Sequence, residues 1–129
     1  MNTTLDHDAL RAAWTTEMNS AKAARGACNH AKEWQHLERA HIISQPLAAR
    51  HVRTHIAMLR FAVRTLDIRE GFGQLFRIVV AAPGTWTGRY PAGNTGGANV
   101  SAFVPMPLPD DLRSLLGAPT PAQHDLLAS

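Results

Sequence analysis

Apolar residues recur every three or four positions along most of the first 80 residues, which is the pattern of amphipathic helices. Four helices are predicted, over residues 4–25, 29–44, 46–66 and 68–80. The first is expected to turn one face toward the core, formed by Leu10, Trp14, Met18 and Ala21. Thr3 or Thr4 is its expected N-terminal cap, and Gly26 its expected stop.

The predicted second helix separates two histidines that lie close together in the sequence. At about 100° per residue, Trp34, Leu37 and His41 form one stripe, with Glu38 on its margin. His36 falls on the opposite, polar side. Only His41 is therefore expected to face the interior.

The predicted third helix begins at Pro46 or Leu47, and a proline suits a first helical position because its missing N–H needs no partner there. Its expected buried face consists of His51, His55, Met58, Leu59, Ala62 and Leu66. Its opposite face carries Arg50, Arg53, Arg60 and Arg64. Both histidines of this helix thus lie on the side predicted to be buried.

The predicted fourth helix has an apolar side and a polar side. The apolar side is expected to be its inner face and consists of Ile68, Phe72, Leu75, Phe76 and Val79. The more polar side carries Glu70, Gln74 and Arg77. Gly71 and Gly73 lower the helix propensity, each by about 1 kcal/mol relative to alanine.

From residue 82 the chain is dense in glycine, proline and asparagine, which favours turns over regular elements. We expect residues 82–109 to form an ordered arm that wraps the helices, residues 110–117 a short final helix, and residues 118–129 a loose tail. The expected fold is mainly α: a single domain over residues 1–117, built as an antiparallel bundle of about four helices with a long C-terminal arm.

Composition narrows the classes of protein further. With 129 residues, 45% of them hydrophobic and 18% charged, the chain can bury one core without crosslinks. Its single cysteine, Cys28, excludes an intramolecular disulfide and a thiolate metal cluster.

The N-terminus does not resemble a signal peptide, and the apolar runs fall short of the ~20 residues of a membrane span. We expect a cytoplasmic protein without membrane contact. A net charge of +3, with the arginines on one helix face, does not favour nucleic-acid binding.

The histidines carry the candidate chemistry. His51 and His55 are spaced i, i+4, which lets two imidazoles bind one metal ion from one helix face. With His41 and Glu38 they offer three nitrogens and one oxygen, a donor set for a divalent transition metal: zinc first, with copper, nickel or cobalt as alternatives. Met58, one turn beyond His55, is a candidate soft fifth contact.

Other interpretations of the same residues remain open. The histidines and Glu38 could form a buried polar network without metal. A metalloenzyme could use the same site, with Glu38 as general base and the arm over the substrate. A metal-free helical interaction module is a third hypothesis. A homo-oligomer or a metal-handling protein is the partner expected for a metal-binding chain.

Four segments of the sequence together carry a resemblance to a protein family. They are the Trp-x-His-Leu-Glu-Arg-Ala-His core over residues 34–41, the His51, His55 and Met58 spacing, Gly73-Gln74, and the Gly-Asn-Thr-Gly arm over residues 93–96. This combination resembles a family of short bacterial proteins of unknown function, over about residues 10–117. The resemblance implies an accessory protein of heavy-metal resistance or efflux, which agrees with the ligand hypothesis.

Overall fold

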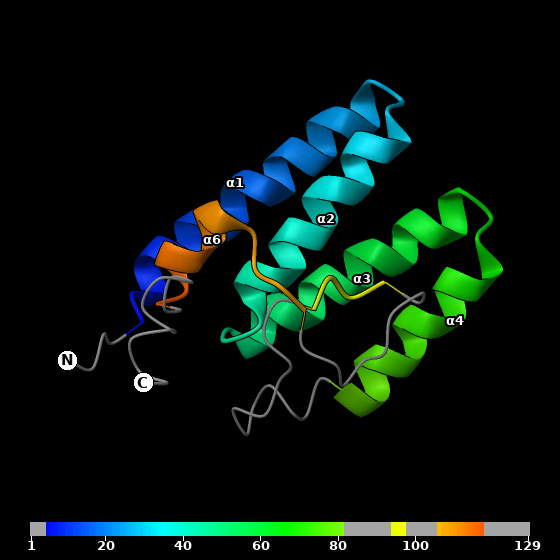
Figure 1. The fold of residues 1–129 in the computed structure, drawn as a ribbon. Coiled ribbons are helices and arrows are strands. Elements are labelled where there is room, and N and C mark those ends of the chain that lie inside the picture. The colour runs from blue at the N-terminus through cyan, green and yellow to red at the C-terminus, as the bar shows by residue number, and fades with distance from the viewer. Residues whose placement is uncertain (1–4, 82–93, 98–105, 118–129) are drawn as a thin grey trace.

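The computed structural model describes residues 5–81, 94–97 and 106–117 (Figure 1). The helices are α1 (His7–Gly26), α2 (His30–Ser44), α3 (Ala48–Arg64), α4 (Ile68–Phe76), the π-helical turn η1 (Arg77–Ala81) and α6 (Asp110–Leu115). The described part of the chain contains no strand, so the prediction of a mainly helical protein is confirmed. None of its helices has the length and apolar character needed to cross a membrane.

The helices form two antiparallel hairpins (Figure 1). Helices α1 and α2 make one hairpin, α3 and α4 make the other, and α2 packs against α3. The short α6 lies beside the N-terminal half of α1. Most of the expected arm, residues 82–93 and 98–105, and the expected tail, residues 118–129, lie outside the described residues. The wrapping of the arm and the domain bounds stay predictions.

Two predicted helix starts were wrong. The carboxylate of Asp6 caps α1 by accepting hydrogen bonds from the backbone N–H groups of Asp8 and Ala9, both at 3.0 Å, so the cap is not a threonine. Helix α3 begins at Ala48, with Leu47 as its N-cap, instead of at Pro46 or Leu47. A carboxylate cap also interacts favourably with the positive end of the helix dipole.

The helix ends also differ in detail from the expectation. Helix α1 ends at Gly26 as predicted, but the left-handed conformation belongs to Cys28, with φ of 54°. After α3, Leu66 adopts φ of 58°. After α6, Gly117 takes φ of 64°, as expected of a glycine stop.

The apolar core has two parts. One joins α1, α2 and α6 and consists of Leu10, Ile42, Ile43, Leu47 and Leu112. The other joins α1, α2 and α3 and consists of Ala21, Leu37 and Met58. Burying one such large apolar side chain contributes about 1.5–3 kcal/mol, so these contacts fix α2 between α1 and α3.

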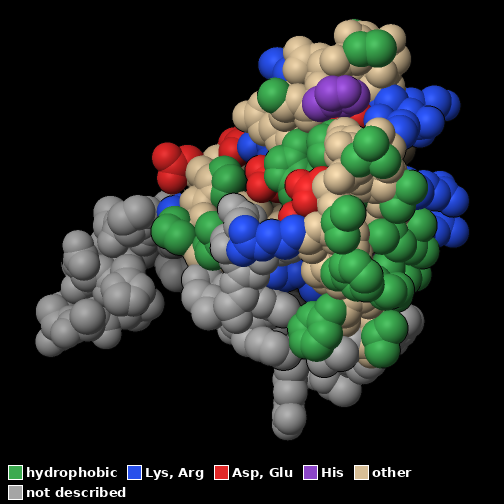
Figure 2. Space-filling model, turned by 90° about the vertical axis from the view of Figure 1, so that its right-hand side faces the viewer, with side chains coloured by type: hydrophobic (Ala, Val, Ile, Leu, Met, Phe, Trp, Pro, Cys, Tyr) green, Lys and Arg blue, Asp and Glu red, His purple; other side chains and the backbone are tan. Residues whose placement is uncertain are grey.

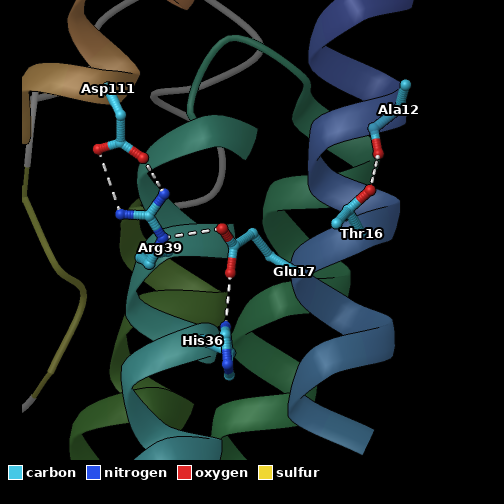
Figure 3. Close-up of polar contacts among 6 residues, drawn as sticks. All are labelled: Ala12, Thr16, Glu17, His36, Arg39 and Asp111. Carbon is cyan, nitrogen blue, oxygen red and sulfur yellow. Dashed lines mark hydrogen bonds and ion pairs between the residues drawn. The ribbon is translucent and has the colours of Figure 1, made fainter.

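An ion-pair cluster links α1, α2 and α6 on the polar side of α2 (Figure 3). The Arg39 guanidinium donates to Glu17 at 2.8 Å and also contacts Asp111 of α6. The Nδ1 atom of His36 lies 2.7 Å from the other carboxylate oxygen of Glu17. His36 therefore points to α1, away from the other histidines of this region, as the helical wheel predicted.

The second hairpin reverses the predicted orientation of α4. The side chains expected on its inner face are exposed instead: Ile68, Phe72, Leu75, Phe76 and Val79. Its polar side is the buried one, with Glu70, Gln74 and Arg77 turned inward. Leu66, expected in the core, is exposed as well. The polar side chains of α4 are buried because they have hydrogen-bond partners in the interior.

Candidate metal centre

Three histidines converge in the interior where α2 meets α3. The Nε2 atom of His51 lies 2.9 Å from that of His41 and 3.0 Å from that of His55, and the Nε2 atoms of His41 and His55 are 3.2 Å apart. The exposed fractions of His41, His51 and His55 are 3%, 4% and 1%. The three nitrogens thus form a nearly equilateral, buried triangle.

The local sequence explains how this triangle forms. His41 lies one turn before the end of α2, and the chain turns back into α3 within a few residues, aided by the hydrogen bond from Leu47 N to the Ser44 carbonyl at 2.7 Å. His51 and His55 follow one helical turn apart on the face of α3 that meets α2. The short connection therefore brings one histidine of α2 against a histidine pair of α3.

A backbone carbonyl fixes the proton of His41. Its Nδ1 atom lies 2.6 Å from the carbonyl oxygen of Asn94, which can only accept a hydrogen bond. Nδ1 must therefore carry the hydrogen and donate it. In a neutral imidazole this leaves Nε2 with a lone pair, aimed at the other two histidines.

A side-chain amide fixes His55 in the same way. Its Nδ1 atom lies 2.6 Å from Oε1 of Gln74. The amide nitrogen of Gln74 donates to Glu70 at 2.6 Å and to the carbonyl of Gly96 at 2.7 Å, which orients the amide oxygen toward His55. Nδ1 of His55 therefore donates, and its Nε2 also presents a lone pair.

Two of the three converging nitrogens are thus acceptors without a hydrogen of their own. The 3.2 Å contact between His41 and His55 cannot be a hydrogen bond between neutral rings, because neither Nε2 has a hydrogen to donate. Lone pairs facing each other in a buried site are unfavourable unless a hydrogen-bond donor or a cation lies between them. Three species can take that place: the Nε2 hydrogen of a neutral His51, an additional proton, or a metal ion.

The surroundings disfavour the proton. Burial lowers the pKa of His41 well below its usual value, and the neighbouring histidines lower it further. Burial likewise lowers the pKa of His51 to about 3 and that of His55 to about 4. The positive charge of Arg77 acts in the same direction on all three. At neutral pH the imidazoles are therefore uncharged, which is the form that binds metal.

The described part of the arm closes over His41. Gly96 has φ of 84°, and a Cβ atom at this position would lie 2.7 Å from Cδ2 and 2.9 Å from Nε2 of His41. The side chain of Asn94 accepts from the Gly96 N–H at 2.9 Å, and Arg77 donates to the carbonyl of Gly97 at 2.7 Å. The glycine is required because the backbone lies directly against the imidazole ring.

The structure brings together three of the five predicted ligands. His41, His51 and His55 form the one group of potential metal-binding histidine, cysteine or acidic side chains found among the described residues. Glu38 instead accepts a hydrogen bond from the Trp34 indole at 3.0 Å, and burial raises the pKa of its carboxyl. Met58 packs in the second core cluster. Metal binding by Glu38 and Met58 stays a prediction.

The sequence interpretation did not assign the groups around the triangle. These are Glu70, Gln74, Arg77, Asn94 and Gly96. Glu70 and Gln74 lie one turn apart on α4, Arg77 follows at helical spacing at the start of η1, and the last two lie in the glycine-rich arm. One feature of the sequence could have indicated these groups. It is the stripe of three polar residues on a helical segment that also has a full apolar stripe.

A protein family of unknown function, DUF3703, has a model that matches residues 8–116. Searches of curated proteins and of solved structures found no match to the chain. The family match covers the whole region in which the motifs and the histidine triangle lie, and it agrees with the resemblance inferred from the sequence. The chain therefore belongs to the DUF3703 family of proteins of unknown function.

Proposed function

We propose that this protein binds one divalent transition-metal ion through Nε2 of His41, His51 and His55. The observation that supports this most strongly is the pair of Nδ1 hydrogen bonds, to Asn94 and to Gln74, which leaves two lone pairs converging in a buried site. Metal-binding histidines typically donate their other ring hydrogen to a carbonyl or carboxylate acceptor in this manner.

The spacing of the nitrogens supports the same proposal. Nitrogens that bind one Zn²⁺ at about 2.0–2.1 Å in tetrahedral directions lie about 3.3 Å apart. The observed separations are 2.9, 3.0 and 3.2 Å, so shifts of a few tenths of an ångström accommodate an ion. The triangle is already assembled on two packed helices, so little ordering is needed on binding.

The donor chemistry limits the choice of ion. Three neutral imidazoles suit zinc, copper, nickel or cobalt and disfavour calcium and magnesium, which prefer oxygen. Zinc is the first candidate because three nitrogens of a tetrahedron leave one open position, which an exchangeable ligand can fill. That position suits transfer or sensing of the ion in metal homeostasis or resistance. It equally suits a small metalloenzyme, the second candidate function.

Elemental analysis and calorimetric titration of the purified protein test the proposal. We expect one equivalent of metal per chain, with binding lost in His51→Gln and His55→Gln, which keep a polar side chain of similar size. His36→Gln is the matched control, because that histidine pairs with Glu17 outside the triangle. It should bind metal like the wild type.

Two results would contradict the proposal. One is a wild-type protein that takes up none of the four metals. The other is stoichiometric metal that survives both substitutions in α3. Glu38→Gln and Met58→Leu test the remaining predicted ligands, since either side chain, if bound to the ion, contributes affinity that its variant loses.

A further inference from the structure

In the described part of the chain, large exposed apolar side chains are concentrated on one face. Among the described residues, seven of them are at least half exposed: Val63, Leu66, Ile68, Phe72, Leu75, Phe76 and Val79. All seven lie between the end of α3 and η1. Figure 2 shows hydrophobic side chains gathered together on this face. We call these seven residues the apolar face.

The apolar face is hollowed between α3 and α4. A groove of about 350 Å³ runs over Leu59, Ala62 and Gly71, with Ile68 and Phe72 on its wall. The small residues Ala62 and Gly71 lie opposite each other on the two helices, and a Cβ on Gly71 would be 3.9 Å from the Ala62 Cβ. The groove therefore has room for large side chains of a partner.

The orientation of α4 explains why the apolar face has no cover within the hairpin. The helix turns its polar stripe inward, where Gln74 binds His55 and Gly96. The apolar stripe on its opposite side then has to face outward. A monomer rarely exposes a contiguous apolar patch beyond about 300–600 Å² unless the patch is functional.

Leu66 adds a second, independent observation. This residue is 85% exposed and adopts φ of 58°, a conformation that favours glycine. Neither apolar core cluster of the described residues includes this leucine. Its side chain projects beside the groove, as a contact with another molecule requires.

We propose that the apolar face is a homodimer interface, in which a second copy of this chain packs against it with two-fold symmetry. The area supports this, because seven large apolar side chains that are 50–85% exposed offer an area comparable to the ~800 Å² that each partner buries in a stable complex. The low charge of the groove also suits an apolar partner surface. The one charged residue lining the groove, Asp67, accepts a hydrogen bond from the Glu70 N–H at 2.9 Å.

Two-fold symmetry makes such a surface complementary to itself. Each copy presents both a groove and projecting side chains, so Phe72 or Leu66 of one copy can enter the groove of the other. A charged partner would need several opposite charges in the groove, and the lining provides one, on Asp67, which already caps α4. The metal site lies on the other side of α4, so dimerisation does not depend on the proposed function.

Sedimentation velocity and light scattering of the full-length chain test the proposal. We expect a dimer of two 14.0 kDa chains at protein concentrations around 10 µM, both with and without chelator. Phe72→Ser and Leu66→Gly should each weaken association by about tenfold or more. Leu66→Gly is informative because glycine suits this backbone conformation, so loss of the dimer would not reflect misfolding. Arg53→Ser, on the exposed side of the same α3 helix, should leave association unchanged.

Three outcomes would overturn the proposal. The wild-type chain could stay monomeric up to about 200 µM, a concentration well above the dissociation constants of the weakest specific interfaces of this size. The dimer could survive both substitutions unchanged. The chain could assemble without limit, which a closed two-fold interface does not allow.

Discussion

Replacing Gly96 by alanine perturbs the candidate metal centre without touching a proposed ligand. The added methyl would lie 2.7–2.9 Å from three atoms of the His41 ring, a distance at which something must move. The ring cannot retreat without lengthening its 2.6 Å hydrogen bond to the Asn94 carbonyl. The φ of 84° adds a conformational cost of about 1–2 kcal/mol for a residue with a Cβ.

Both effects reach the metal through His41. Disturbing the groups that orient a ligand typically costs 10–100-fold in metal affinity, or about 1.4–2.8 kcal/mol. We therefore expect Gly96→Ala to weaken zinc binding by at least about tenfold and to lower the stability of the metal-free protein by about 1–3 kcal/mol. Competition titration against a chromophoric chelator gives the first quantity, and urea denaturation in EDTA gives the second.

Gly26→Ala is the matched control for this experiment. A Cβ at position 26 would meet nothing within 4 Å, and Gly26 does not adopt a positive φ. Its zinc affinity should equal that of the wild type. Equal zinc affinities of Gly96→Ala and Gly26→Ala would contradict this expectation, because His41 would then not depend on the backbone that lies against it.

Three further predictions concern the same region. Gln74→Met removes the acceptor for His55 and should weaken zinc binding by about 10–100-fold in the competition titration; unchanged affinity would show that this acceptor does not orient the ligand. In chelator, the stability measured by urea denaturation should fall as the pH drops from about 6.5 toward 4, by about 1.4 kcal/mol per pH unit for each buried histidine. The reason is that the unfolded chain takes up protons at its ordinary histidine pKa, whereas the pKa values of His51 and His55 in the folded chain are about 3 and about 4. A flat profile over this interval would argue against their burial as neutral groups. Leu66→Gly should raise the stability of the monomeric chain by about 0.5–1 kcal/mol, measured at a concentration at which the protein does not associate, and a loss of stability would contradict the strain inferred from its φ of 58°.

The helical wheel predicted the triangle because its three members lie on helices with ordinary amphipathic packing. His41 shares a stripe with Leu37, and His51 and His55 share one with Met58, and all are buried. Apolar neighbours in the same stripe thus indicate correctly which way these histidines point. Periodicity alone also separated His36 from the cluster.

The same method failed for α4, where it identified both stripes and placed the wrong one inside. A hydrophobic pattern assigns the interior to the apolar stripe only when no polar group in the interior needs a partner. Here His55 and the backbone of Gly96 supply partners for Gln74, so burying the polar stripe is favourable.

Contacts between distant parts of the chain could not be predicted from the sequence, for a different reason. The hydrogen bond between His41 and the Asn94 carbonyl joins residues 53 positions apart, and its acceptor is a backbone group that every residue possesses. No side-chain pattern identifies such an acceptor. The glycine-rich composition around residue 96 indicated an unusual backbone, without indicating what lies against it.

The two faces of α4 have a thermodynamic consequence. A single helix of nine residues holds the amide that orients His55 on one side and Phe72 on the other. A displacement of this helix would move both Gln74 beside the metal site and Phe72 in the proposed interface. If dimerisation changes the affinity for metal by some factor, metal must change the dimer affinity by the same factor, since coupling free energies are reciprocal. Metal occupancy and oligomeric state would then each report on the other through one short rigid element.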